Sequence, residues 1–182
     1  DKAIACFKRS IELARLIPDP IEESRALHNL GYLYLQLGGE SELAEATTHL
    51  WAALKARRGR VREEWETLGT VFAVRTRYRV PFGGLDGDER LLAELTALAP
   101  KLVAAEEFDR ALETYDYIFE LLSHRPGCPI RMLIDHTESA LALAEQTWWR
   151  SERLAAQHHY AQRIATLAAR RAFLGCWSGE PA

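Results

Sequence analysis

Cysteine is scarce in this chain of 182 residues, and its three cysteines, Cys6, Cys128 and Cys176, stand far apart. They form no CxxC pair and are odd in number, which argues against a disulfide framework and indicates reduced thiols in a cytoplasmic protein. No apolar run approaches the roughly 18 residues that a membrane span requires, and no signal peptide is visible. We therefore expect a cytoplasmic chain without a membrane partner.

The chain also lacks the residue patterns that carry common metal and catalytic chemistry. None of its six histidines follows a glutamate by three residues, as di-iron helical bundles require. His124, Cys128 and His136 match no zinc spacing, and nothing supplies the third group that would orient a catalytic cysteine. The glycines at 83–84 are followed by aspartates, which would repel a phosphate. We expect no metal, no cofactor and no enzyme, and rank a helical enzyme domain below the two hypotheses that follow.

Neither positive nor negative charge is in large excess, because the net charge is −3 and 27% of the residues are charged. This composition is typical of a soluble globular chain rather than of an electrostatic binder. Residues 55–79 depart from it, since eight basic residues stand against three acidic ones, a local excess of +5. Tyr78 lies among these arginines, a combination that suits phosphate contact with base stacking. The alternatives are a solvated helix end and a surface for an acidic protein partner. The arginines of such an anion or nucleic-acid contact would be Arg57, Arg58, Arg60, Arg62, Arg75, Arg77 and Arg79.

Helical spacing, in contrast, is abundant, and it is clearest between residues 25 and 56. Apolar and small residues recur there at three- and four-residue steps, so each set shares one face of a helix. The sets are L-x2-LG-x2-Y and A-x3-L-x2-A, formed by Leu27, Leu30, Gly31, Tyr34, Ala46, Leu50 and Ala53. Gly31 would cost about 1 kcal/mol in mid-helix relative to alanine. We therefore expect a second helix to lie too close there for a methyl group.

Start and stop signals divide this region into two helices. We expect one helix over 20–37, with Asp19 as its cap and Glu22 completing a capping box. The glycine pair at 38–39 would end it in the left-handed conformation. Ser41 would cap the next helix, over 41–57.

The remaining segments continue the helical pattern, with helices over 2–16, from about 61 to 76, and from about 87 after a loop over 77–87. Two interpretations exist around Pro100. Either it lies inside a helix over 95–111, or a short helix ends near 98 and Pro100 starts a long one, and we prefer the second because proline is tolerated at a helix start.

The segment from 130 to 174 contains no glycine or proline. One helix of that length would be about 68 Å long at 1.5 Å per residue. We prefer a hairpin that breaks near Arg150, with Ser151 as the cap of its second helix. The segment 175–182 would be a loose tail.

The paired helix patterns resemble the tetratricopeptide repeat, a helix-turn-helix unit with small residues where its helices cross. Trp65, Leu68, Gly69 and Phe72 repeat the first-helix signature as W-x2-LG-x2-F, and the two Leu-Gly pairs are 38 residues apart. That spacing exceeds the usual repeat of about 34 residues and is similar to the repeats in sensor arms of large bacterial regulators. The resemblance implies an all-α, right-handed superhelical array of about eight antiparallel helices over 1–174.

The same resemblance implies a function in protein–protein interaction. Such solenoids bind peptide or protein partners in a concave groove, so the chain would be a sensor or scaffold module of a larger regulatory protein. Its start at Asp1, already inside a helical pattern, is in keeping with that expectation. The positions that would face the groove are Arg25, His28, Asn29, Tyr32 and Gln36 in one helix and Glu63, Glu66, Thr67 and Thr70 in the next.

Overall fold

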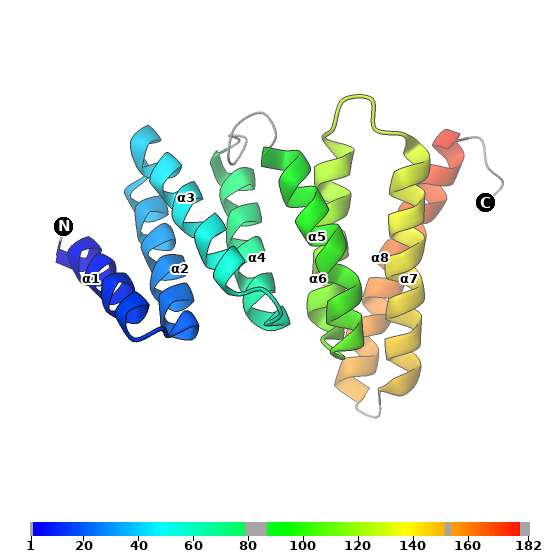
Figure 1. Ribbon diagram of the computed structural model, residues 1–182. Coiled ribbons are helices and arrows are strands. Elements are labelled where there is room, and N and C mark those ends of the chain that lie inside the picture. Colours follow the sequence, from blue (N-terminus) through cyan, green and yellow to red (C-terminus); the bar gives the residue numbers. More distant parts are fainter. Residues whose placement is uncertain (1, 79–86, 152–153, 179–182) are drawn as a thin grey trace. The chain divides into compact units, whose positions relative to one another are not determined.

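The computed structural model describes residues 2–78, 87–151 and 154–178. Over these ranges the regular structure consists of eight α-helices without a strand (Figure 1), which confirms the all-helical prediction. The helices are α1 (Lys2–Leu16), α2 (Pro20–Leu37), α3 (Glu40–Ala56), α4 (Val61–Tyr78), α5 (Gly87–Ala104), α6 (Phe108–Ser123), α7 (Ile130–Arg150) and α8 (Leu154–Ser178).

The chain divides into two compact units, Asp1–Glu94 and Leu95–Ala182. In the first unit, α2 and α3 pack along each other as a hairpin (Figure 1). α2 also contacts α1 and α4. In the second unit, α7 packs against both α6 and α8. Leucine dominates the fully buried side chains of both units, with Leu30, Leu50 and Leu68 in the first and Leu112 and Leu122 in the second.

The ends of α2 follow from the residues that flank it. The Asp19 side chain accepts hydrogen bonds from the backbone N–H groups of Ile21 and Glu22, each 3.1 Å long, and Pro20 occupies the first helical position, as predicted. Gly38 ends the helix in the left-handed conformation, with φ of 74°. The predicted capping box is wrong, because the Asp19 N–H donates to the carbonyl of the preceding helix and Glu22 pairs with an arginine instead.

The start of α3 differs from the prediction by one residue. This helix begins at Glu40, and Gly39 precedes it without a side-chain cap. Ser41 therefore lies inside the first turn, where its hydroxyl donates to Glu42 at 2.8 Å, so the prediction that it caps α3 is wrong. The two glutamates of this turn complement the positive end of the helix in place of a cap.

Gly31 marks the point where α2 and α3 cross closely, as predicted. A Cβ atom added to Gly31 would lie 2.8 Å from Leu50 Cγ and 3.2 Å from the carbonyl oxygen of Ala46. Leu50 and Ala46 are completely buried, so neither has room to move away. The glycine therefore allows the two helices to share one core.

We predict that Gly31→Leu lowers the free energy of unfolding by about 1–3 kcal/mol, because the new side chain would overpack against Leu50. The urea midpoint measures the change. Tyr32→Leu introduces the same residue at the adjacent, exposed position and should stay within about 0.5 kcal/mol of the wild type. Equal midpoints for the two variants would contradict a close crossing at Gly31.

The preferred interpretation of Pro100 is wrong, because this residue lies inside α5. The cost of an internal proline, about 3 kcal/mol, is offset by burial of the helix face around it, on which Leu98 and Leu102 are almost completely inaccessible. The chain turns after Ala104, where Glu106 adopts φ of 58° and the N–H of Glu107 donates to the carbonyl of Leu102 at 2.9 Å. This is a Schellman motif without its usual glycine, so the sequence carried no signal for it.

We predict that Glu106→Gly raises the free energy of unfolding by up to about 1 kcal/mol, because glycine adopts the left-handed conformation without the steric cost of a Cβ atom. A shift of the urea midpoint to higher concentration measures this gain. Glu106→Ala keeps the Cβ atom and is the matched control. A gain of equal size in both variants would show that the gain comes from removal of the carboxylate rather than from relief of backbone strain.

The predicted break after Arg150 is confirmed, since α7 ends there and α8 follows at Leu154. Ser151 ends α7 through its N–H, which donates to the carbonyl of Trp148 at 3.2 Å. Its role as the cap of the second helix stays a prediction, because residues 152 and 153 lie outside the described residues. α8 continues to Ser178, and residues 175–178 of the predicted tail are therefore helical.

Two other predicted segments fall partly outside the described residues. Of the loop predicted over 77–87, Arg77 and Tyr78 belong to α4 and Gly87 begins α5, while residues 79–86 lie outside the description. The last four residues of the predicted tail, 179–182, lie outside it as well.

Candidate functional site

The predicted groove residues lie on two neighbouring helices of the first unit. α2 and α4 contact each other, and the turn that joins α3 to α4 carries Arg57 beside them. We use the name α2–α4 surface for the predicted groove residues together with this arginine. Its members are Arg25, His28, Asn29, Tyr32, Gln36, Arg57, Glu63, Glu66, Thr67 and Thr70.

Arg57 is the centre of a buried network in this surface. Its side chain is only 5% exposed. One guanidinium nitrogen, Nη1, donates to the hydroxyl of Thr67 at 2.9 Å and to the backbone carbonyl of Glu63 at 3.1 Å. The carboxylates of Glu63 and Glu66 lie 3.7 and 3.6 Å from the guanidinium. Burial lowers the pKa of Arg57 while these two carboxylates raise it, so the network keeps a desolvated cation paired.

His28 connects α2 to this network. Its Nδ1 atom lies 3.5 Å from Nη1 of Arg57 and 3.5 Å from the hydroxyl of Thr67. Burial, and to a smaller degree the positive charge of Arg57, lower the pKa of His28 to about 4. The imidazole is therefore neutral at pH 7, and it contacts a cation without charge repulsion.

The other α2 residues of the surface remain exposed and do not join the network. Asn29 and Gln36 are exposed, and the Tyr32 side chain keeps 52% of its accessible area. Arg25 pairs with Glu22 of its own helix. On α4, the hydroxyl of Thr70 donates to a backbone carbonyl one turn earlier. The surface thus combines a polar network at buried Arg57 and half-buried His28 with exposed amide and aromatic groups, which we call the rim.

The predicted arginine patch is largely neutralised by carboxylates of the same unit. Arg60 bonds to the hydroxyl of Ser24 at 2.9 Å and pairs with Glu63 at 3.0 Å. Arg58 pairs with Glu94 at 2.5 Å, and Arg75 pairs with Asp88 at 3.0 Å. These two acidic partners belong to α5, outside the window of residues 55–79, so counting charge within that window missed them.

The rest of the patch does not change this result. Arg57 is buried, Arg62 and Arg77 are exposed, and Arg79 lies outside the described residues. The local excess of positive charge in the sequence therefore does not become a continuous basic surface over the residues that the structure describes.

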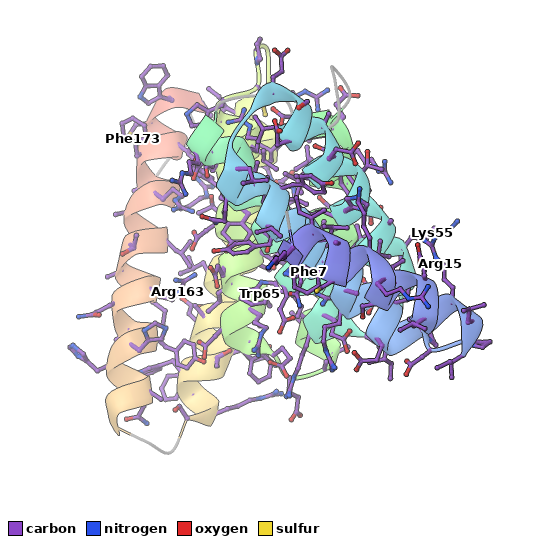
Figure 2. The ribbon with its side chains drawn as sticks, turned by 90° about the vertical axis from the view of Figure 1, so that its left-hand side faces the viewer. Phe7, Arg15, Lys55, Trp65, Arg163 and Phe173 are labelled. Carbon is purple, nitrogen blue, oxygen red and sulfur yellow. The ribbon has the colours of Figure 1, made fainter. Side chains whose placement is uncertain are left out.

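The second unit contains a cavity that the sequence analysis did not anticipate. Its volume is about 240 Å³, and it lies between α6 and one face of α8, lined by Asp116, His159, Gln162, Arg163, Thr166, Leu167 and Arg170. Arg163, which extends from α8 (Figure 2), pairs with Asp116 at 2.7 Å, and Arg170 pairs with the same carboxylate at 3.0 Å. Because 47 residues separate Asp116 from Arg163, local spacing carried no signal for this pair.

Comparison with known proteins found no matching family model and no matching curated protein. Among the described residues, no helix combines the length and the hydropathy needed to cross a bilayer. Over the same part of the chain, no three side chains of His, Cys, Asp or Glu are grouped so that they could hold a metal ion.

We predict that the chain loses stability as the pH falls from 7 to 5, in part through His28. Its pKa is about 4 in the folded chain and about 6.5 in the unfolded chain, so the unfolded state binds more protons in this interval and is favoured as the pH falls. For this half-buried group the contribution is on the order of 1–2 kcal/mol.

His28→Gln should therefore narrow the difference between the urea midpoints at pH 7 and pH 5. The difference should not vanish, because burial also lowers the pKa of His49 and of His136. If His28→Gln kept the full wild-type difference, the neutral, buried state of His28 would be wrong.

Proposed function

We propose that this chain is a protein-interaction module that binds an extended segment of a partner protein on the α2–α4 surface. The observation that carries the proposal is the contact of His28 on α2 with Thr67 on α4 and with Arg57. The exposed groups of the rim are amides and an aromatic ring, which suit pairing with an extended peptide backbone. In this proposal the module acts inside a larger regulatory or scaffold protein.

A tetratricopeptide-like, right-handed superhelical array is part of the same proposal. The close crossing of α2 and α3 at Gly31 supports it, because that repeat has small residues where its helices meet. The position of Trp65, Leu68 and Gly69 within α4 also supports it. The W-x2-LG-x2-F pattern then lies on the helix that follows the α2–α3 pair, where the next repeat would begin.

Nucleic-acid contact through the arginines of residues 57–79 is the weaker alternative. Binding of a phosphate backbone would require these arginines to exchange their partners, which include Glu63, Asp88 and Glu94. Such binding would weaken steeply with added salt, whereas a neutral groove would not show that dependence.

We predict that Asn29→Ala combined with Tyr32→Ala weakens binding to the partner by about 2 kcal/mol or more, because the double substitution removes an amide and an aromatic platform from the rim. A pull-down with the whole chain identifies the partner, and calorimetry at two salt concentrations measures the affinity. The melting temperature should stay close to that of the wild type, since both side chains are exposed.

The control is Thr48→Ala, an exposed substitution on α3. Unchanged affinity in the double variant would move the binding surface elsewhere. A steep loss of affinity with salt in the wild type would favour the arginines instead.

A further inference from the structure

Two arginines of α8 converge on a single carboxylate of α6 beside the cavity of the second unit. Arg163 Nη2 donates to one carboxylate oxygen of Asp116 at 2.7 Å, and Arg170 Nη1 donates to the other oxygen at 3.0 Å. Arg170 also lies over the ring of Phe119, with its guanidinium carbon 4.1 Å from the ring centroid. The orientation of Arg170 is therefore held from two sides, by an anion and by an aromatic face.

This cluster holds more positive than negative charge, because two guanidinium groups that stay protonated share one carboxylate. Arg163 and Arg170 are half-buried, so water screens their charge only in part. Over the residues that the structure describes, Asp116 is the hydrogen-bond partner of both arginines, and each bond uses one of the five N–H groups of a guanidinium. The two side chains can therefore bind a second anion without releasing Asp116.

The walls of the cavity suit an anion that carries a short apolar part. Both arginines line the cavity together with Leu167, a buried side chain that provides apolar surface. Gln162 and Thr166, which also belong to the lining, are exposed and carry no charge. The volume of about 240 Å³ is below the roughly 300–1,000 Å³ of sites for drug-sized molecules, so the cavity selects a small ligand.

We propose that this cavity binds a small organic monocarboxylate. Its carboxylate is held by Arg163 and Arg170, and its hydrocarbon part lies against Leu167. A planar carboxylate matches the fork of N–H groups that a guanidinium presents. Asp116 limits the charge of the ligand, because it leaves one net positive charge in the cluster and repels a dianion. The site belongs to the second unit and does not depend on the proposed function of the α2–α4 surface.

Saturable chemical-shift changes in the whole ¹⁵N-labelled chain test the class of ligand. The probes are acetate, propionate, butyrate, butyramide and sulfate at pH 7 and constant ionic strength. We expect the signals of Arg163, Thr166 and Arg170 to shift, and the affinity to rise by up to about fourfold for each added methylene group. The uncharged butyramide should bind about tenfold more weakly than butyrate or worse, and the dianion sulfate should also bind more weakly. No saturable change with any carboxylate, or equal binding of butyrate and butyramide, would overturn the proposal.

Substitution of single arginines tests which side chains hold the carboxylate. Arg163→Gln and Arg170→Gln should each weaken butyrate binding about tenfold or more, the loss of one charge-assisted hydrogen bond. The matched control is Arg171→Gln, because Arg171 belongs to the same helix but pairs with Glu138 at 2.7 Å, outside the lining of the cavity. This control should bind butyrate as tightly as the wild type, and urea midpoints verify that each variant is folded. Equal losses in all three variants would indicate attraction by overall charge and would overturn the proposed site.

Asp116→Asn tests the selection of a single negative charge. The substitution raises the net charge of the cluster by one, so sulfate should gain affinity relative to butyrate. An unchanged ratio of the two affinities would contradict the role of Asp116. If this variant does not fold, the wild type and the arginine variants decide the proposal, since a cluster that only joins α6 to α8 would bind no butyrate.

Discussion

The buried guanidinium of Arg57 is the constraint on which the organisation of the first unit depends. A charge withdrawn from water costs several kcal/mol unless partners replace its hydration. Here the partners come from two helices: Glu63, Glu66 and Thr67 on α4, and His28 on α2. The need to pair this one cation therefore fixes the position of the turn after α3 relative to α2 and α4. Loss of Glu63 or Glu66 leaves part of this charge uncompensated, so the surface and the fold are energetically coupled.

His28 shows how this coupling reaches the surface. Its low pKa has burial as the main cause and the adjacent cation as the second, and both oppose protonation. A protonated ring would add a second positive charge beside Arg57. The ring therefore stays neutral over the ordinary range of pH, with its orientation held by contacts beneath it. A pre-oriented side chain loses little conformational entropy on binding, which favours recognition by a small number of hydrogen bonds.

Local patterns predicted the elements of the fold well, because the spacing of apolar residues and the caps act within one or two turns. The pattern around Leu30 and Gly31 indicated a helix, its buried face and the close crossing, and Asp19 indicated where the helix begins. The errors arose where distant contacts outweigh local preference. Pro100 is tolerated in mid-helix because leucines on both sides of it are buried, and Glu106 ends that helix without a glycine.

The same distinction explains the candidate site. The repeat pattern selected residues of α2 and α4 for one surface, and the structure brings His28, Thr67 and Glu63 into one network. The repeat pattern could not reveal that Arg57 is the buried centre of that network, because its charge grouped this residue with the basic patch. The partners of Arg58 and Arg75 on α5 were equally hidden, because ion pairs across 36 and 13 residues leave no local signal.

These pairings also bear on the proposed function of the surface. When each cation of a polar network has a carboxylate within about 4 Å, the field outside the network is weak and screened further by salt. Attraction at a distance then contributes little to binding, and a partner must gain its affinity from direct hydrogen bonds and from contact with exposed rings such as Tyr32. Such contacts require an exact match of donor and acceptor positions, because a buried group left unpaired costs about 1–3 kcal/mol. The neutral arrangement around Arg57 therefore supports the proposed binding of an extended polypeptide, whose backbone carbonyls are neutral acceptors.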